Sequence, residues 1–144
     1  MSWNDKLGRS VLYGGIVLAI VLICSFFAVT AALNKRNWEQ RTVEYESKGA
    51  EFGKNSDQAG CIQEGLLRSR SAVGSEIAET GLNSTFTSAC LHSSRPTVEF
   101  CNDIPSMDLD EWMDSQCRKA GLERAQPGCL KTLEAKIDFC ATTR

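Results

Sequence analysis

The N-terminal part of the chain divides into an apolar run and a polar continuation. The run from Val11 to Leu33 holds 23 residues without a charge. A helix of that length reaches about 35 Å, which is enough to cross a bilayer once. A cleaved secretory signal has an apolar core of only about 7 to 15 residues, so residues 11–33 are predicted to be a retained transmembrane helix. Residues 1–10 then form a short cytoplasmic N-terminus.

Small residues lie four positions apart within this run, for example Ala28 and Ala32. Such spacing allows a second membrane helix to approach closely, although chance often produces it. Cys24 follows Ile23 rather than a small residue, which a lipid-modified cysteine would normally follow. We therefore interpret Cys24 as an unmodified thiol within the membrane.

A polar, proline-free stretch at residues 34–56 predicts that the helix continues beyond the membrane as a stalk. Its aromatic residues Trp38, Tyr45 and Phe52 are seven positions apart, so they lie nearly above one another on a helix. They form either a seam for a partner helix or, alternatively, an interfacial tryptophan followed by two residues that cover the domain. Trp38 and Tyr45 are the stalk residues that we assign to partner binding.

The helical pattern continues after the stalk, whose last turns are weakened by Gly49 and Gly53. Apolar residues at helical spacing predict a helix over residues 57–80, with Gly81 as its stop signal. Residues 82–89 are small and polar, and they predict a loop.

Two prolines mark predicted helix starts further along, because proline is tolerated in the first turn of a helix. Pro96 predicts a short helix that reaches Cys101, and Pro127 predicts the last helix, which carries Cys140 on its apolar face. No segment alternates with the period of a strand over a useful length. The fold class is therefore all-α, with residues 57–144 forming a small, cysteine-rich helical domain.

The densest chemical pattern outside the cysteines is acidic: six carboxylates and no Lys or Arg lie between Glu99 and Asp114. Asp108 and Glu111 resemble a capping box, which starts a helix that ends before Gly121. The acidic face suggests a recognition patch for a basic partner. The alternative is that the carboxylates of the first turn interact favourably with the helix dipole and the others are simply solvated. A calcium site is a weaker alternative, because this segment lacks the glycine and the ligand spacing of a calcium-binding loop. The assigned partner-binding residues of this face are Asp108, Asp110, Glu111, Trp112 and Asp114.

Six of the seven cysteines lie downstream of the membrane run, and four of them form a repeated Cys-x(10)-Cys frame. Eleven helical steps separate Cys129 and Cys140 by roughly 16 Å, whereas a disulfide needs Cα atoms within about 7 Å. Cys90 and Cys101 obey the same constraint if the repeat is structural as well as sequential, although Pro96 disfavours a continuous helix between them. The two cysteines of a frame therefore bond to other elements. Of the pairings that remain, we favour one that joins the two halves of the domain. The first half holds Cys61, Cys90 and Cys101, and the second holds Cys117, Cys129 and Cys140. The favoured pairing consists of Cys61–Cys117, Cys90–Cys140 and Cys101–Cys129.

The orientation in the membrane rests on the cysteines rather than on charge. The basic residues near the span are Lys6 and Arg9 before it and Lys35, Arg36 and Arg41 after it, which is close to even. Six thiols without the short Cys-x(2–4)-Cys knuckles of zinc sites indicate structural disulfides in an oxidising compartment. We expect a single-pass protein of the cell inner membrane, with its C-terminal domain in the periplasm or an equivalent space.

Charge and composition exclude several functions. Residues 34–144 carry 14 Lys and Arg against 17 Asp and Glu, a net charge of −3, which does not suit nucleic acid. His92 is the only histidine, so no histidine metal cluster can form, and we assign no catalytic residue, metal, cofactor or small-molecule substrate. We expect a non-enzymatic accessory or anchoring subunit that docks on other membrane or envelope proteins through its span, stalk and acidic face. The alternatives are a membrane-tethered inhibitor or immunity factor and a thiol-disulfide or metal-handling protein.

Overall fold

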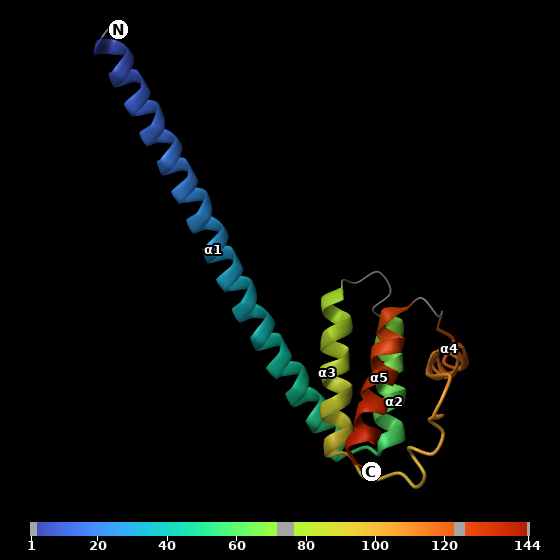
Figure 1. The fold of residues 1–144 in the computed structure, drawn as a ribbon. Coiled ribbons are helices and arrows are strands. Elements are labelled where there is room, and N and C mark those ends of the chain that lie inside the picture. Colours follow the sequence, from blue (N-terminus) through green and yellow to red (C-terminus); the bar gives the residue numbers. More distant parts are fainter. Residues whose placement is uncertain (1–2, 72–76, 123–125, 144) are drawn as a thin grey trace. The chain divides into compact units, whose positions relative to one another are not determined.

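The computed structural model describes residues 3–71, 77–122 and 126–143, and most of the chain within these ranges is helical (Figure 1). Its elements are α1 (Trp3–Lys54), α2 (Gln58–Ser71), α3 (Ile77–Ser93), α4 (Leu109–Lys119) and α5 (Pro127–Thr142). The described residues contain no strand, only one isolated bridge between Asp57 and Arg95. The predicted all-α class is confirmed.

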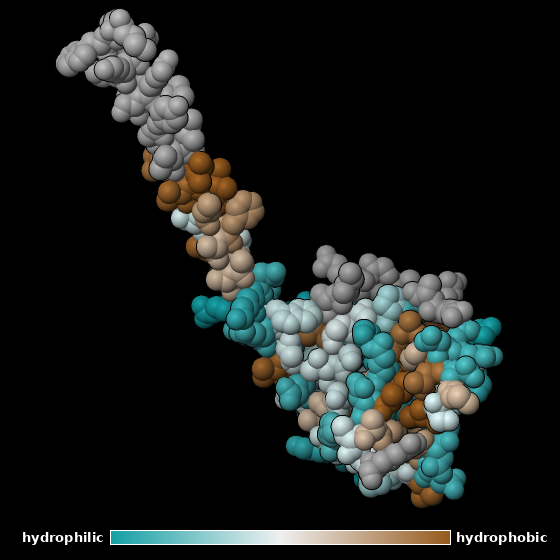
Figure 2. Space-filling view, viewed as in Figure 1, coloured by the Kyte–Doolittle hydropathy of each residue, from teal (hydrophilic) through white to brown (hydrophobic). Residues whose placement is uncertain are grey.

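The chain divides into two compact units, Met1–Gln40 and Arg41–Arg144. The described residues of the first unit belong to α1, and the apolar side chains described in it are exposed (Figure 2). Within the described residues, one helical segment, Ile20–Lys54, is long and apolar enough to cross a membrane. The side chains of residues 11–17 and 19, which belong to the predicted span, lie outside those described.

In the second unit, which we call the domain, α2, α3 and α5 lie side by side around a buried core (Figure 1). A polar seam crosses this core. The amide of Asn83 donates hydrogen bonds to the carbonyl oxygen of Gly65 and to Ser69 Oγ, each at 2.9 Å. It also donates to Thr132 Oγ1 of α5 at 3.2 Å. The seam therefore joins all three helices through short side chains.

The predicted loop at residues 82–89 is wrong, because these residues lie inside α3. Their small polar side chains are used within the bundle rather than in turns: the Thr87 hydroxyl, for instance, donates to the Asn83 carbonyl at 2.9 Å. Gly81 likewise lies within α3 rather than at a helix end. The predicted helix over residues 57–80 is replaced by α2 and the start of α3, and its residues 72–76 lie outside the described residues.

The helix predicted from Pro96 to Cys101 is also wrong, because the chain forms turns there. The Thr97 amide donates to Gln58 Oε1 at 2.9 Å, so the start of α2 holds this segment. Glu99 has a positive φ of 57°, which a right-handed helix does not allow.

The ends of α4 and α5 follow the sequence signals only in part. Asp108 precedes α4 with a left-handed φ of 61° and makes no capping hydrogen bond through its side chain, so the predicted capping box is wrong. Gly121 has a φ of 71° just beyond α4. Its amide and that of Leu122 donate to the carbonyls of Arg118 and Cys117, both at 2.9 Å, which is the hydrogen-bond pattern of a Schellman turn. Pro127 begins α5, as predicted.

Three disulfides close the domain, and none links the two cysteines of one repeated frame, as predicted. The bonds, with Cα–Cα distances of 5.7, 5.7 and 6.0 Å, are Cys61–Cys90, Cys101–Cys140 and Cys117–Cys129. All three favoured pairs are therefore wrong. The reason is that α2 and α3 run antiparallel, which brings Cys61 near the start of one helix to Cys90 near the end of the other. In each half the first cysteine bonds to the second, and the third cysteines join the halves.

The last turns of α1 lie directly against α3. A Cβ atom at Gly49 would be 2.2 Å from the carbonyl oxygen of Phe86, and one at Gly53 would be 2.5 Å from that of Cys90. The two helices therefore touch backbone to backbone, which only glycine permits. These glycines do not end the helix early, because α1 continues to Lys54.

Candidate functional site

The N-terminal end of α4 combines exposed carboxylates with exposed apolar side chains. Asp108, Asp110 and Glu111 are exposed, and none of them takes part in the ion pairs of the described residues. Beside them, Met107 is 75% exposed and Leu109 is 37% exposed. We call these five residues the acidic end of α4. The positive end of the helix dipole stabilises these carboxylates. Their side chains are also accessible to a partner.

Two carboxylates of the predicted acidic face act inside the domain instead. Asp114 is only 7% exposed and forms an ion pair with Arg118, one turn further along α4. Asp103 accepts hydrogen bonds from the ammonium group of Lys136 at 2.6 and 2.9 Å. Asp114 therefore contributes little surface to the docking face that the sequence predicts.

Trp112 helps to fix α4 on α5 rather than standing free. The half-buried indole ring lies 5.6 Å from the ammonium nitrogen of Lys136, which also lies 4.6 Å from the centre of the Phe100 ring. Lys136 itself is 7% exposed. A buried cation is costly unless it is paired, and here one carboxylate and two aromatic faces compensate it. This arrangement holds the acidic end of α4 in a defined position.

The stalk aromatics lie in different units. Trp38 belongs to the first unit and is 41% exposed. Tyr45 belongs to the domain, where it is half-buried and its hydroxyl donates to Glu79 Oε2 at 3.1 Å. The Arg41 guanidinium donates to the other oxygen of Glu79. That bond lowers the pKa of the Glu79 carboxyl below its usual range, against the opposing effect of desolvation, and the Tyr45 hydrogen bond adds to the lowering.

Lowering the pH should reduce the unfolding free energy of the domain, in part through protonation of Glu79. Because the folded-state pKa of Glu79 lies below its unfolded value of about 4.3, the ionised carboxylate stabilises the domain above that value. This contribution is lost as the pH falls through the folded-state pKa. We expect the difference in unfolding free energy between wild type and Glu79→Gln to be largest at neutral pH and to vanish in acid.

Urea titrations of the full-length chain in detergent, repeated from neutral to acidic pH, measure this difference. Glu51→Gln, at an exposed position of α1, is the matched control and should follow the wild type at every pH. Identical pH dependence in wild type and Glu79→Gln would show that the Arg41–Glu79 contact adds nothing to stability.

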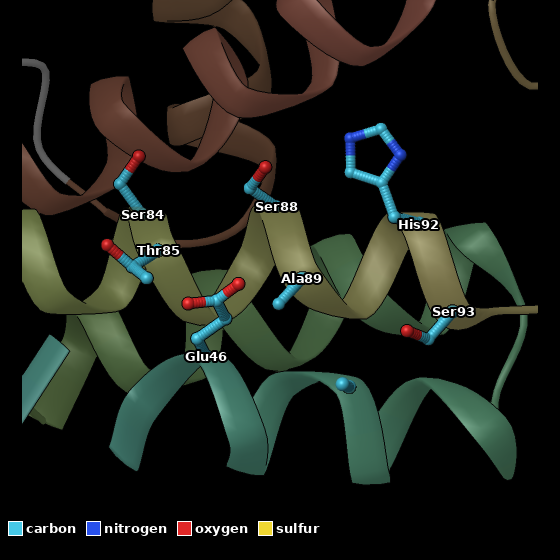
Figure 3. A pocket seen from close by; sticks show the side chains of 8 residues that line it. Glu46, Ser84, Thr85, Ser88, Ala89, His92 and Ser93 are labelled. Carbon is cyan, nitrogen blue, oxygen red and sulfur yellow. The ribbon is translucent and has the colours of Figure 1, made fainter. Parts of the chain in front are cut away.

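A shallow groove of about 530 Å³ runs between the end of α1 and α3 (Figure 3). Ser84, Ser88 and His92 point in the same direction from α3, and Glu46 extends from α1. The His92 ring makes an edge contact with Phe139, with the ring centres 5.2 Å apart. Within the described residues, no group of three or more His, Cys, Asp or Glu side chains is arranged to hold a metal ion. The groove is lined by serine, threonine and alanine side chains together with Glu46 and His92, and we assign it no ligand.

Sequence reasoning missed two features that position these surfaces. The first is the contact of Gly49 and Gly53 with α3, for which the four-residue spacing of small residues was an available signal. The second is the placement of Lys136 between Asp103 and the aromatic rings of Phe100 and Trp112. No sequence signal identifies it, because a lysine at this spacing on a helix is ordinarily solvated.

Comparisons with models of known protein families, with curated proteins and with solved structures find no match to this chain.

Proposed function

We propose that this chain is a non-enzymatic accessory subunit of a membrane or envelope protein assembly. The helix α1 anchors it in the membrane, and the acidic end of α4 docks on a neighbouring subunit of the assembly. One observation carries this proposal: the helix that contains the apolar run also supplies Gly49 and Gly53 to the disulfide-bonded domain. A single element thus belongs both to the anchor and to the docking domain.

The disulfides support docking more than chemistry. All six cysteines of the domain are bonded, so no domain thiol is available for exchange or for metal binding, while Cys24 of α1 is free. Three bonds within a small domain also restrict its conformations before binding. A preordered surface loses less entropy on association, which favours tight docking.

The same bonds support a location outside the cytosol. Disulfides persist in oxidising compartments and are rare where thiols are kept reduced. With one span, the domain then lies in the periplasm or an equivalent space, and the residues before the span lie in the cytoplasm.

Purification of the full-length chain from membranes in mild detergent tests the docking role. We expect a stoichiometric protein partner to be retained by the wild type and lost from the double variant Asp110→Lys with Glu111→Lys. The double variant Glu51→Lys with Asp138→Lys changes the net charge equally at exposed positions of α1 and α5, and it should keep the partner. Recovery of the wild-type chain largely alone would instead favour a free inhibitor, and equal retention by both variants would reject the acidic end as the docking face.

A further inference from the structure

A cleft of about 230 Å³ lies between α2 and the C-terminal end of α4. Its apolar part comes from Leu66 and from Leu67, which is 49% exposed. Its charged part comes from Arg70 and Lys119, and no carboxylate of the described residues lines it. We call this feature the cationic cleft. Its volume equals that of roughly eight liquid water molecules, enough for one large apolar side chain.

The turn that ends α4 holds Arg70 in place. Its guanidinium donates a hydrogen bond to the carbonyl oxygen of Ala120, the last residue before Gly121. A Cβ atom at Gly121 would lie 3.1 Å from the nearer guanidinium nitrogen, so the arginine packs closely across this turn. The cationic cleft therefore presents a positioned guanidinium, which is suited to a carboxylate partner.

The acidic end of α4 and the cationic cleft carry opposite charges, and each also exposes apolar side chains. The acidic end carries Asp110 and Glu111 beside the exposed Met107, and the cationic cleft carries two cations beside two leucines. The eleven residues of α4 separate the two ends by about 16 Å along one helix. They cannot meet within one molecule.

We propose that the acidic end of one copy docks in the cationic cleft of a second copy. Met107, the most exposed apolar side chain at that end, enters the cleft, since its flexible thioether adapts to irregular apolar spaces. Asp110 and Glu111 then pair with Arg70 and Lys119 of the second copy by charge-assisted hydrogen bonds. The contact joins two different surfaces, so it propagates head to tail into a row or closes into a ring.

This inference rests on the proposed docking role of the acidic end and names its partner as a second copy of the chain. Because every copy is anchored in the same membrane, the domains are confined to one side of it and meet at a high local concentration. Such confinement allows contacts to form that are weak in dilute solution.

Sedimentation of the full-length chain in detergent, with two complementary variants, tests the contact. One variant carries Asp110→Lys and Glu111→Lys and keeps its cleft; the other carries Lys119→Ala, which leaves Arg70 as the one cation named in its cleft, and keeps its acidic end and the Arg70 bond to α4. We expect wild type to form species larger than a dimer. Each variant alone should self-associate at least about tenfold more weakly, a loss of about 1.4 kcal/mol.

An equimolar mixture of the two variants is the decisive sample. The intact cleft of the first variant can accept the intact acidic end of the second, and the altered surfaces block further growth. We therefore expect the mixture to form a dimer of one copy of each and to stop there. Unchanged self-association of either variant, or a mixture that stays monomeric, would overturn the proposal. The Glu51→Lys and Asp138→Lys control should associate as wild type does.

The outcomes separate this inference from the proposed function. If self-association is insensitive to the variants while a different stoichiometric partner is lost from the acidic-end variant, the second copy is the wrong partner and the docking role stands. If the chain purifies only with itself and the mixture forms the expected dimer, the contact stands and the accessory role on another protein is wrong.

Discussion

Replacing Cys101 and Cys140 together with alanine should lower the unfolding free energy of the domain by about 4 kcal/mol. This disulfide spans 39 residues, the longest separation of the three, and a cross-link restricts the unfolded chain more as the closed loop grows. It also joins the two halves of the domain and holds the segment between α3 and α4 on α5. A small domain is stable by only about 5 to 15 kcal/mol, so this loss is a large share of the total.

The effect is measured by urea unfolding of the full-length chain in detergent, followed by near-ultraviolet circular dichroism. Alanine at Cys117 and Cys129, which are 12 residues apart, should cost about 3 kcal/mol by the same relation. Cys24→Ala, in the first unit, should leave the domain unchanged. A loss below about 1 kcal/mol for the Cys101 and Cys140 pair would mean that packing alone holds the two halves together.

Gly49→Ala should lower the unfolding free energy by about 2 kcal/mol, although alanine is the better helix former. At an ordinary helix position this exchange stabilises by about 1 kcal/mol. Here the new methyl group would lie 2.2 Å from the backbone carbonyl oxygen of Phe86, which cannot rotate away. Overpacking of this kind typically costs about 1 to 3 kcal/mol, and a contact this short belongs at the upper end of that range.

Gly60→Ala in α2 is the matched control, because its methyl group would meet the Ser56 hydroxyl, a side chain that can move. We expect this control to be neutral or slightly stabilising under the same urea titration. A gain in stability for Gly49→Ala equal to that of the control would contradict the direct backbone contact between α1 and α3.

Local signals in the sequence predict the class of the fold and several helix ends. Pro127 and Gly121 mark helix ends through backbone constraints that do not depend on distant residues. The spacing of Cys129 and Cys140 on one helix excludes a disulfide between them by helix geometry alone. Each of these predictions depends on a property of one short segment, and each is confirmed.

Several of the wrong predictions depend on which segments become neighbours, although the helix from Pro96 and the Asp108 capping box are local predictions that are also wrong. The small polar residues of α3 resemble a loop until α2 and α5 surround them and receive their hydrogen bonds. The disulfide partners follow from the antiparallel pairing of α2 with α3, which the spacing of Cys61 and Cys90 does not reveal. Among the predicted site residues, Asp108, Asp110 and Glu111 are accessible, whereas Asp114 is buried and pairs with Arg118.

We propose that α1 anchors an oxidised, disulfide-locked domain in a membrane. Disulfide mapping of the chain isolated from alkali-washed membranes tests it most directly, with free thiols alkylated before any reduction. We predict that the chain stays in the washed membranes, that Cys24 is the single alkylated thiol, and that the linked peptides pair Cys61 with Cys90, Cys101 with Cys140 and Cys117 with Cys129. Release of the chain into the wash, or alkylation of the domain cysteines, would contradict it.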